Sequence, residues 1–237
     1  MPKKPAFSIV TPTLNEEKII CETLGALKKM APDAEYVVAD GRSSDKTEQV
    51  ALKCGAHVVF EGKGFRSIGA GRNAGARAAK SDILVFIDAD TVPDKAFFPR
   101  MLKEFEDPSV VGVGCKIMPR ELTPMREFIF EILNLFVKLS VRLDRPSIAG
   151  NCVAYRRDAF FKISGFDEEM QASEDQDLCV RISRLGRVVY FKDVTAFTSS
   201  RRLKKMGWLG LLFDWGGTTL NFLTGKKTER YAIIREI

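Results

Sequence analysis

The chain has 237 residues, a formal net charge of +6 at pH 7 and a hydrophobic fraction of 45%. This length suits one large α/β domain and leaves little room for a second. Five scattered cysteines without a C-x-x-C pair argue against a disulfide framework and against a zinc site. With no signal-peptide core and no uninterrupted apolar span, we expect a cytoplasmic protein that does not cross a membrane.

The positive charge is concentrated near the end of the chain. Residues 201–237 contain eight Lys or Arg and three Asp or Glu, so residues 1–200 are nearly neutral. A nucleic-acid-binding protein would spread its basic residues along one face of the domain, so we expect no nucleic-acid partner. We therefore divide the chain into a domain of residues 1–200 and a basic, amphipathic helical extension of residues 201–237.

Strand and helix patterns alternate through the first half of the chain. Apolar runs predict strands at 7–11, 36–40, 57–60 and 83–87, and helices are predicted at 15–30, 44–54, 69–80 and 94–105. Such alternation predicts an α/β fold with a mostly parallel sheet and right-handed crossovers. The second half is less regular, with strands predicted at 110–116, 151–155 and 187–191 and helices at 124–143 and 174–185.

The stretch from Ile83 to Asp90 is the most informative part of the chain. Five apolar residues form the pattern of a buried strand, and Asp88 and Asp90 stand at its carboxyl end. Ligands bind at the carboxyl ends of strands in open α/β sheets. Two carboxylates there need a cation, and a divalent ion such as Mg²⁺ or Mn²⁺ that carries substrate phosphates would supply it. A solvated Asp-x-Asp turn is the plainer alternative.

Polar residues at two other places fit a nucleotide site. Asp40 ends a predicted strand, where its carboxylate can accept hydrogen bonds from a base or a ribose. Helix capping by Ser44 and Asp45 explains the following loop equally well but gives Asp40 no role. Arg72, on a predicted helix rich in Ala and Gly, offers a guanidinium to a phosphate or a base.

An acidic helix start lies later in the chain. Ser173 is the predicted N-cap, and Glu174, Asp175 and Asp177 fall in the first turn, where the helix dipole stabilises carboxylates. By itself this pattern fits an acidic, solvated first turn of a helix.

Together these segments resemble glycosyltransferase family 2, the inverting sugar-nucleotide transferases with the GT-A fold. The resemblance covers residues 7–200 and rests on six motifs in the family's order. They are Thr11-Pro12-Thr13-Leu14-Asn15-Glu16, Asp40-Gly41-Arg42-Ser43-Ser44-Asp45-Lys46-Thr47, Arg72-Asn73-Ala74-Gly75, Asp88-Ala89-Asp90, Gly165-Phe166-Asp167-Glu168 and Glu174-Asp175. The resemblance implies an enzyme with a nucleoside diphosphate sugar as its donor.

The resemblance also implies roles for individual residues on the nucleotide side. Thr11, Pro12 and Glu16 would border the nucleotide, Asp40 would hold the base, and Arg72 would contact the base or the phosphates.

Three acidic residues would carry the chemistry in such an enzyme. Asp88 would face the ribose side, Asp90 would bind Mg²⁺ or Mn²⁺ directly, and Asp175 would be the general base. Inverting transfer is a single displacement through an oxocarbenium-like transition state. It needs one base on the acceptor side and charge stabilisation at the leaving diphosphate.

The chain departs from the family pattern at two places. Ala39 stands where many members have a second acidic residue, and residues 195–202 contain no His, which some members use as a further metal ligand. We therefore expect the protein's own metal shell to be incomplete without substrate. Arg201 and Arg202 are candidates to supply positive charge to the pyrophosphate.

The acceptor is expected to be a hydroxyl on a saccharide or on a lipid-linked substrate. A polyprenyl-phosphate glycosyltransferase, whose phosphate acceptor needs no base, is one alternative. A nucleotidyltransferase is another, although it would more typically carry a Gly-rich, Lys-bearing loop in place of residues 11–17.

Two amphipathic stretches have several interpretations. In residues 125–143 a narrow polar stripe, spaced at steps of three or four, runs along an otherwise apolar helix pattern. Residues 205–223 have an aromatic face flanked by lysines, as interfacial membrane helices do. Either stretch would cover the domain, form a homodimer interface or contact the inner face of the membrane peripherally.

Overall fold

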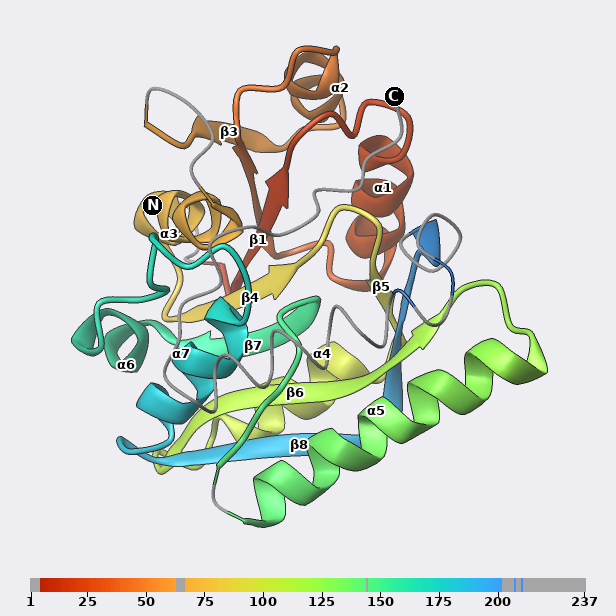
Figure 1. Ribbon diagram of the computed structural model, residues 1–237. Coiled ribbons are helices and arrows are strands. Elements are labelled where there is room, and N and C mark those ends of the chain that lie inside the picture. The colour runs from red at the N-terminus through yellow and green to blue at the C-terminus, as the bar shows by residue number, and fades with distance from the viewer. Residues whose placement is uncertain (1–4, 63–66, 144, 202–206, 208–209, 211–237) are drawn as a thin grey trace.

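The computed structural model describes residues 5–62, 67–143, 145–201, 207 and 210 (Figure 1). One eight-stranded sheet runs through this part of the chain, with the strand order β3-β2-β1-β4-β7-β6-β8-β5. Helices pack on both of its faces. Arg202 and nearly all of the predicted extension at 201–237 lie outside the described residues.

The first half of the sheet is parallel, as the alternation of strands and helices predicts. It consists of β1 (Ser8–Thr13), β2 (Glu35–Asp40), β3 (His57–Phe60) and β4 (Ile83–Ile87), with β1 between β2 and β4. The central strands β1, β2 and β4 are covered on both faces, so nearly all of their residues are buried. This burial explains the apolar run of β4 and the apolar middle of β2, while β1 also buries Ser8, Thr11 and Thr13.

The second half of the sheet is mixed. β7 (Cys152–Arg156) is antiparallel to both β4 and β6 (Val110–Pro119), whereas β6 is parallel to β8 (Arg187–Thr198). A short strand, β5 (Val92–Pro93), follows Asp90 and pairs with the end of β8. β8 is therefore much longer than its apolar pattern predicts, because its second half is held between β5 and β6.

The described helices are close to those predicted, with one addition. They are α1 (Ile20–Met30), α2 (Thr47–Lys53), α3 (Ile68–Ala78), α4 (Phe97–Glu104), α5 (Pro124–Arg142), α6 (Arg157–Lys162) and α7 (Glu174–Ile182). The sequence does not predict α6, because six residues are too few for a periodic pattern. None of the helices in the described ranges has both the length and the hydrophobicity to cross a bilayer.

Helices α1 and α2 begin later than predicted, and the reason lies in two loops. Asn15 has φ of 57°, and its side-chain oxygen accepts a 2.8 Å hydrogen bond from the backbone N of Ser44. Asp45 accepts hydrogen bonds from the backbone N atoms of Thr47 and Glu17, at 2.9 and 3.2 Å. These side chains therefore join the loops after β1 and β2 to each other, ahead of the helices.

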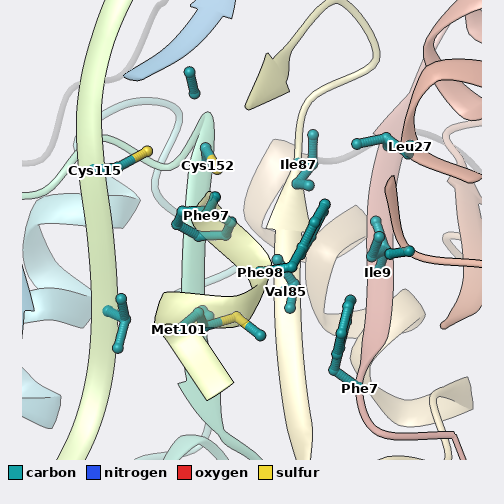
Figure 2. Packing of buried hydrophobic residues seen from close by; sticks show 14 of the residues in the cluster. Phe7, Ile9, Leu27, Val85, Ile87, Phe97, Phe98, Met101, Cys115 and Cys152 are labelled. Carbon is teal, nitrogen blue, oxygen red and sulfur yellow. The ribbon is translucent and has the colours of Figure 1, made fainter. Parts of the chain in front are cut away.

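Two buried clusters hold the sheet between its helices. Figure 2 shows the cluster on the side of α1 and α4, which includes Ile9 of β1, Ile87 of β4 and Phe97 of α4. The other cluster lies on the side of α3, α6 and α7 and contains Phe86 and Phe160, whose ring centroids are 5.4 Å apart. Packing on both faces fixes the strands whose ends carry the predicted site.

The sequence argues against a disulfide framework, but one disulfide is present among the described residues. Cys21 on α1 is bonded to Cys54, directly after α2, and their Cα atoms are 5.8 Å apart. The two helices pack together, but a separation of 33 residues carries no motif from which this contact could be predicted. Cys115, Cys152 and Cys179 are buried free thiols.

Candidate active site

The candidate site lies where β1 and β4 end at the same edge of the sheet. These parallel strands are neighbours, and the chain runs from β1 to β2 and β3 on one side before it returns to β4 on the other. Such a change of direction creates a ligand site outside the carboxyl ends of the strands. It brings Glu16, which follows β1, close to Asp90, which follows β4.

Asp90 is surrounded by hydrogen-bond donors at this edge. Its Oδ1 accepts hydrogen bonds of 3.2 Å from the hydroxyl groups of Thr91 and Thr198. Its Oδ2 lies 3.0 Å from Nη2 of Arg201. The side chain keeps 17% of its surface exposed, so a ligand can reach the carboxylate from solvent.

Arg201 connects the ends of β1 and β4. Its guanidinium donates hydrogen bonds to both carboxylate oxygens of Glu16, at 2.8 and 3.0 Å, and to Asp90. Burial lowers the pKa of Arg201, but the hydrogen bonds and negative charges of Glu16 and Asp90 outweigh burial and raise it. The residue predicted to meet the pyrophosphate therefore contacts the predicted metal ligand itself.

Arg72, on α3, is almost completely buried beside the same strand end, with 2% of its side chain exposed. Nη1 lies 2.7 Å from Oε1 of Glu174, and Nη2 lies 2.9 Å from Oδ1 of Asp88 and 3.2 Å from the carbonyl oxygen of Gly150. Burial lowers the pKa of Arg72, but the nearby negative charges outweigh burial and raise it. These charges are those of Asp88, Glu174 and Asp175. The resemblance implies a contact with base or phosphate, whereas this guanidinium joins β4, α7 and the segment before β7.

The two carboxylates that share Arg72 differ in exposure, because Asp88 keeps 21% of its side chain exposed and Glu174 keeps 8%. Burial raises the pKa of Asp88, and the charge of Arg72 opposes this shift while that of Asp90 adds to it. Burial and repulsion from Asp175 raise the pKa of Glu174 to about 7, again against the effect of Arg72. Carboxylates crowded in this way are typical of active sites.

Asp175, the predicted base, is half-buried at the start of α7, beside the buried Glu174. Its Oδ2 accepts a 2.8 Å hydrogen bond from the backbone N of Gly150. Gly150 thus contacts Asp175 through its N–H and Arg72 through its carbonyl oxygen. A Cβ atom at this position would lie 2.8 Å from the Arg72 guanidinium, so the close approach requires glycine.

Ser173 does not cap α7 in the predicted way. It precedes the helix, but its φ is 63° and its side chain makes no capping hydrogen bond. The left-handed backbone at this residue turns the chain into the helix, so that Glu174 and Asp175 follow at once.

The predicted nucleotide residues on the first two strands lie next to this edge. Asp40 ends β2, and its carboxylate accepts hydrogen bonds from the backbone N and the hydroxyl of Ser43, at 2.6 and 2.8 Å. Asp40 therefore organises the turn after β2, a local role that the sequence analysis did not assign. Thr11 is buried on β1, with no hydrogen-bond partner at its Oγ1, and Pro12 is half-buried beside it.

The carboxylate oxygens of Asp90 are ligands of the kind that a divalent cation takes when it arrives with a substrate. Within the described ranges, no group of three or more His, Cys, Asp or Glu side chains could hold a metal ion. Mg²⁺ is commonly bound through one or two carboxylates together with substrate phosphates and water, and Mn²⁺ prefers similar oxygen ligands. One accessible carboxylate at Asp90, with Glu16 nearby, matches that requirement.

The arrangement also contains residues that are not among the predicted site residues, namely Thr91, Gly150, Glu174 and Thr198. Glu174 stands next to Asp175 in an acidic helix start, so the sequence contained a signal for it. Gly150 and Thr198 carry no such signal. They reach the site because β7 pairs with β4 and β8 pairs with β5, far apart in the chain.

Solved structures share this fold. The mannosyltransferase PcManGT from Pyrobaculum calidifontis, in complex with GDP-Man and Mn²⁺, has a TM-score of 0.69 and 21% identity over 87% of this chain and 60% of that chain. Glucosyl-3-phosphoglycerate synthase from Mycobacterium tuberculosis, in complex with Mn²⁺, UDP and phosphoglyceric acid, has a TM-score of 0.67 and 20% identity over 96% and 81%. The likeness shows the GT-A fold.

Sequence relatives include two named transferases and a biosynthesis protein. The succinoglycan biosynthesis protein ExoA of Rhizobium meliloti is 27% identical over 91% of this chain and 69% of its own length. The O-antigen chain rhamnosyltransferase RfbN of Salmonella typhimurium is 24% identical over 78% and 63%. The pre-mycofactocin glycosyltransferase of Mycobacterium tuberculosis is 27% identical over 63% of this chain, which spans 33% of that protein.

A family match covers the part of the chain that contains the strand-end motifs. The family described as "Glycosyl transferase family 2" matches residues 8–163, from β1 to the end of α6. The match includes Glu16, Asp40, Arg72 and the Asp88–Asp90 segment, in the order of the motifs above. Sequence, fold and relatives agree, and this chain belongs to glycosyltransferase family 2.

Proposed function

We propose that this chain transfers a sugar from a nucleoside diphosphate sugar to an acceptor hydroxyl, with inversion at the anomeric carbon. The observation that carries the proposal is the buried Arg72, which pairs with Asp88 after β4 and with Glu174 at the start of α7. This contact brings the strand end that bears Asp90 together with the helix start that bears Asp175. Family membership, and structural neighbours in complex with GDP-Man or UDP-GlcNAc, support the class of donor.

Asp175 acts as the general base in this proposal. It accepts two backbone hydrogen bonds, from Gly150 and Gln176, and each oxygen retains further acceptor capacity. It can therefore take the proton of an acceptor hydroxyl as the new glycosidic bond forms and the bond to the diphosphate breaks. An inverting displacement needs one such base. Arg72 is a positioning residue, because it ties α7 to the end of β4.

The nucleotide lies along the ends of β1 and β2 in this proposal. Thr11 and Pro12 border it, Asp40 is at the base, and Asp88 is on the ribose side. The support is their common position at the carboxyl edge of the parallel strands.

Asp90 holds Mg²⁺ or Mn²⁺ together with diphosphate oxygens and water in this proposal. When bound, such an ion stabilises the negative charge that develops on the leaving diphosphate. Arg201 places a second cation at the same edge, and it must release or share Asp90 when a metal ion is coordinated. Glu16 can keep Arg201 at the edge, because it accepts both of the other hydrogen bonds.

The experiment that tests the base is Asp175→Asn. A thermal-shift panel of sugar nucleotides with Mn²⁺ first identifies the donor, since a ligand at one hundred times its Kd stabilises a protein by about 2.7 kcal/mol. With that donor and a hydroxyl acceptor, kcat should fall by roughly 10²–10⁴-fold while donor affinity is kept.

The matched control is Asp177→Asn in the same helical turn. Its carboxylate pairs with Arg181, so this change should leave kcat within a few-fold of the wild type. If Asp175→Asn behaved like this control with a hydroxyl acceptor, the base assignment would be wrong. If the variant kept full activity only with a polyprenyl phosphate, the phosphate-acceptor alternative would replace the proposal.

A lipid-linked acceptor and contact of residues 201–237 with an anionic membrane complete the proposal. The support is compositional, because each Lys or Arg near such a surface contributes about 1 kcal/mol. The full chain should co-sediment with anionic liposomes at low salt and be released at high salt. Replacing Lys204, Lys205, Lys226 and Lys227 by Gln should weaken co-sedimentation and leave nucleotide affinity unchanged. Equal sedimentation of both proteins would refute the membrane contact.

A further inference from the structure

Helix α5 presents a continuous apolar stripe to solvent. The stripe follows steps of three and four along the helix, and each of its large side chains leaves between 45% and 62% of its surface exposed. Its members are Met125, Phe128, Ile132, Leu135, Phe136 and Leu139. In Figure 1 the helix lies along β6 and β8 at the periphery of the molecule. We call these six residues the outer stripe.

The opposite face of α5 is fixed to the domain. Asn134 accepts a 3.1 Å hydrogen bond from the backbone N of Ile117 and donates one of 2.8 Å to the carbonyl oxygen of the same residue. Its side-chain oxygen also accepts from the hydroxyl of Tyr190 at 3.1 Å. Ile129 and Phe130 are buried beside it. These contacts determine the rotation of the helix, so the outer stripe cannot turn into the core.

The outer stripe is large for a surface that only meets water. Six large side chains, each about half exposed, present roughly 600 Å² of apolar surface. That area is at the upper end of the largest patch on ordinary monomers, and patches of this size are often interaction sites. A standard protein interface buries about 800 Å² on each partner, which the stripe and its borders would supply.

The charges along one border of the stripe indicate what covers it. Glu127 and Glu131 lie in the N-terminal half of α5, and Lys138 and Arg142 lie in the C-terminal half. The two pairs lie symmetrically about the middle of the helix. When two such helices pack antiparallel, the same border of each meets, so Glu127 faces Arg142 of the second copy and Glu131 faces its Lys138.

The helix dipole favours this order of charges but does not require that they share a border. Two cations near the stripe are already neutralised, because Lys116 of β6 pairs with Glu131 and Arg126 pairs with Glu121. These pairs therefore offer no net positive charge to an anionic lipid surface. The acidic residues at the border also repel such a surface. The border charges of one α5 helix are therefore complementary to those of a second, antiparallel copy.

We propose that the outer stripe is a homodimer interface, in which two α5 helices pack antiparallel about a two-fold axis near Leu135. The apolar stripe supplies the buried area, and the border charges set the antiparallel direction. This inference does not depend on the reaction that the site catalyses.

The test is the oligomeric state of the full chain by sedimentation velocity over a range of concentrations. The wild type should dimerise, and Leu135→Glu should raise the dimer dissociation constant on the order of 100-fold, because it places two carboxylates together at the two-fold axis. The matched control is Leu52→Glu on α2, where Leu52 is 51% exposed against 54% for Leu135. The control should dimerise as the wild type does, and both variants should keep the wild-type circular dichroism.

Charge reversal tests the antiparallel direction. Glu127→Arg and Arg142→Glu should each weaken the dimer, and the two changes together should restore it. A monomeric wild type, or a dimer unaffected by Leu135→Glu, would overturn the proposal. So would failure of the double reversal to restore dimerisation. Liposome binding should be the same for the wild type and Leu135→Glu, and its loss in the variant would show that the stripe contacts lipid instead.

Discussion

Arg72→Met removes the buried guanidinium that joins β4 to α7. The change leaves Asp88 and Glu174 without the guanidinium that lies 2.9 and 2.7 Å from them. Removing one partner of a buried ion pair costs about 3–5 kcal/mol, because the remaining charge stays buried without compensation. For a chain of this size each kcal/mol lowers Tm by roughly 2–4 °C, so Tm should fall by roughly 6–20 °C.

The loss should depend on pH, and its direction follows from the pKa of Glu174. Its value is about 7 in the folded protein, against an ordinary value of 4.5. An acid whose pKa is higher in the folded state binds more protons there, so its contribution to stability falls as pH rises from 4.5 to 7. Without Arg72 the pKa values of Glu174 and Asp88 should rise further. Arg72→Met should therefore lose less stability in mild acid than at pH 8.

Urea unfolding monitored by circular dichroism at the two pH values is the assay. Arg100→Met is the control, because Arg100 forms a 2.7 Å ion pair with Asp193 at the surface, where such pairs contribute less than about 1 kcal/mol. Adding Glu174→Gln to Arg72→Met should recover part of the loss, because it removes one uncompensated charge. If Arg72→Met cost no more than the control, or cost the same at both pH values, the assignment of Arg72 as the central buried cation would fail.

Three further changes test the site and the scaffold. Asp90→Ala should abolish Mn²⁺-dependent binding of a nucleoside diphosphate in calorimetry, and unchanged affinity would remove Asp90 from the metal site. Arg201→Ala should strengthen binding of Mn²⁺ alone, measured by electron paramagnetic resonance, and weaken binding of the diphosphate. If the affinities for Mn²⁺ and for the diphosphate changed in the same direction, Arg201 and the metal ion would not compete for Asp90. Cys21→Ser should lower the free energy of unfolding by about 3 kcal/mol under oxidising conditions, since the bond to Cys54 closes a 33-residue separation. Reductant should remove the difference from the wild type.

The parallel half of the sheet could be predicted because its local patterns agree with its packing. β3 and β4 begin and end at the residues predicted, since turn residues bound short apolar runs. The direction of β7 could not be predicted, because it depends on where the chain re-enters the sheet and not on the residues of the strand. The starts of α1 and α2 were missed because Asn15 and Asp45 bond to neighbouring loops instead of capping the helices where predicted.

The positions of the candidate site residues on the fold could be predicted better than their contacts. Asp88, Asp90 and Asp175 stand at strand and helix ends, and such ends are visible in a sequence. The direction of the Arg72 side chain could not be predicted. It depends on contacts with Glu174 and Gly150, which are far from Arg72 in the sequence. Arg201 was placed near the pyrophosphate from its position alone, and its contacts with two carboxylates arise from the pairing of β8 with β5.

The contact between Arg201 and Asp90 makes the strand edge and the end of the chain thermodynamically coupled. A cation that binds Oδ2 of Asp90 competes with the guanidinium, and Arg201 is covalently continuous with residues 202–237. Any partner that draws this part of the chain away from Asp90 therefore raises the affinity of Asp90 for a cation. By reciprocity, the cation raises the affinity of the chain for that partner by the same factor. Cation binding at Asp90 and partner binding to the chain beyond Arg201 are thus linked through one ion pair.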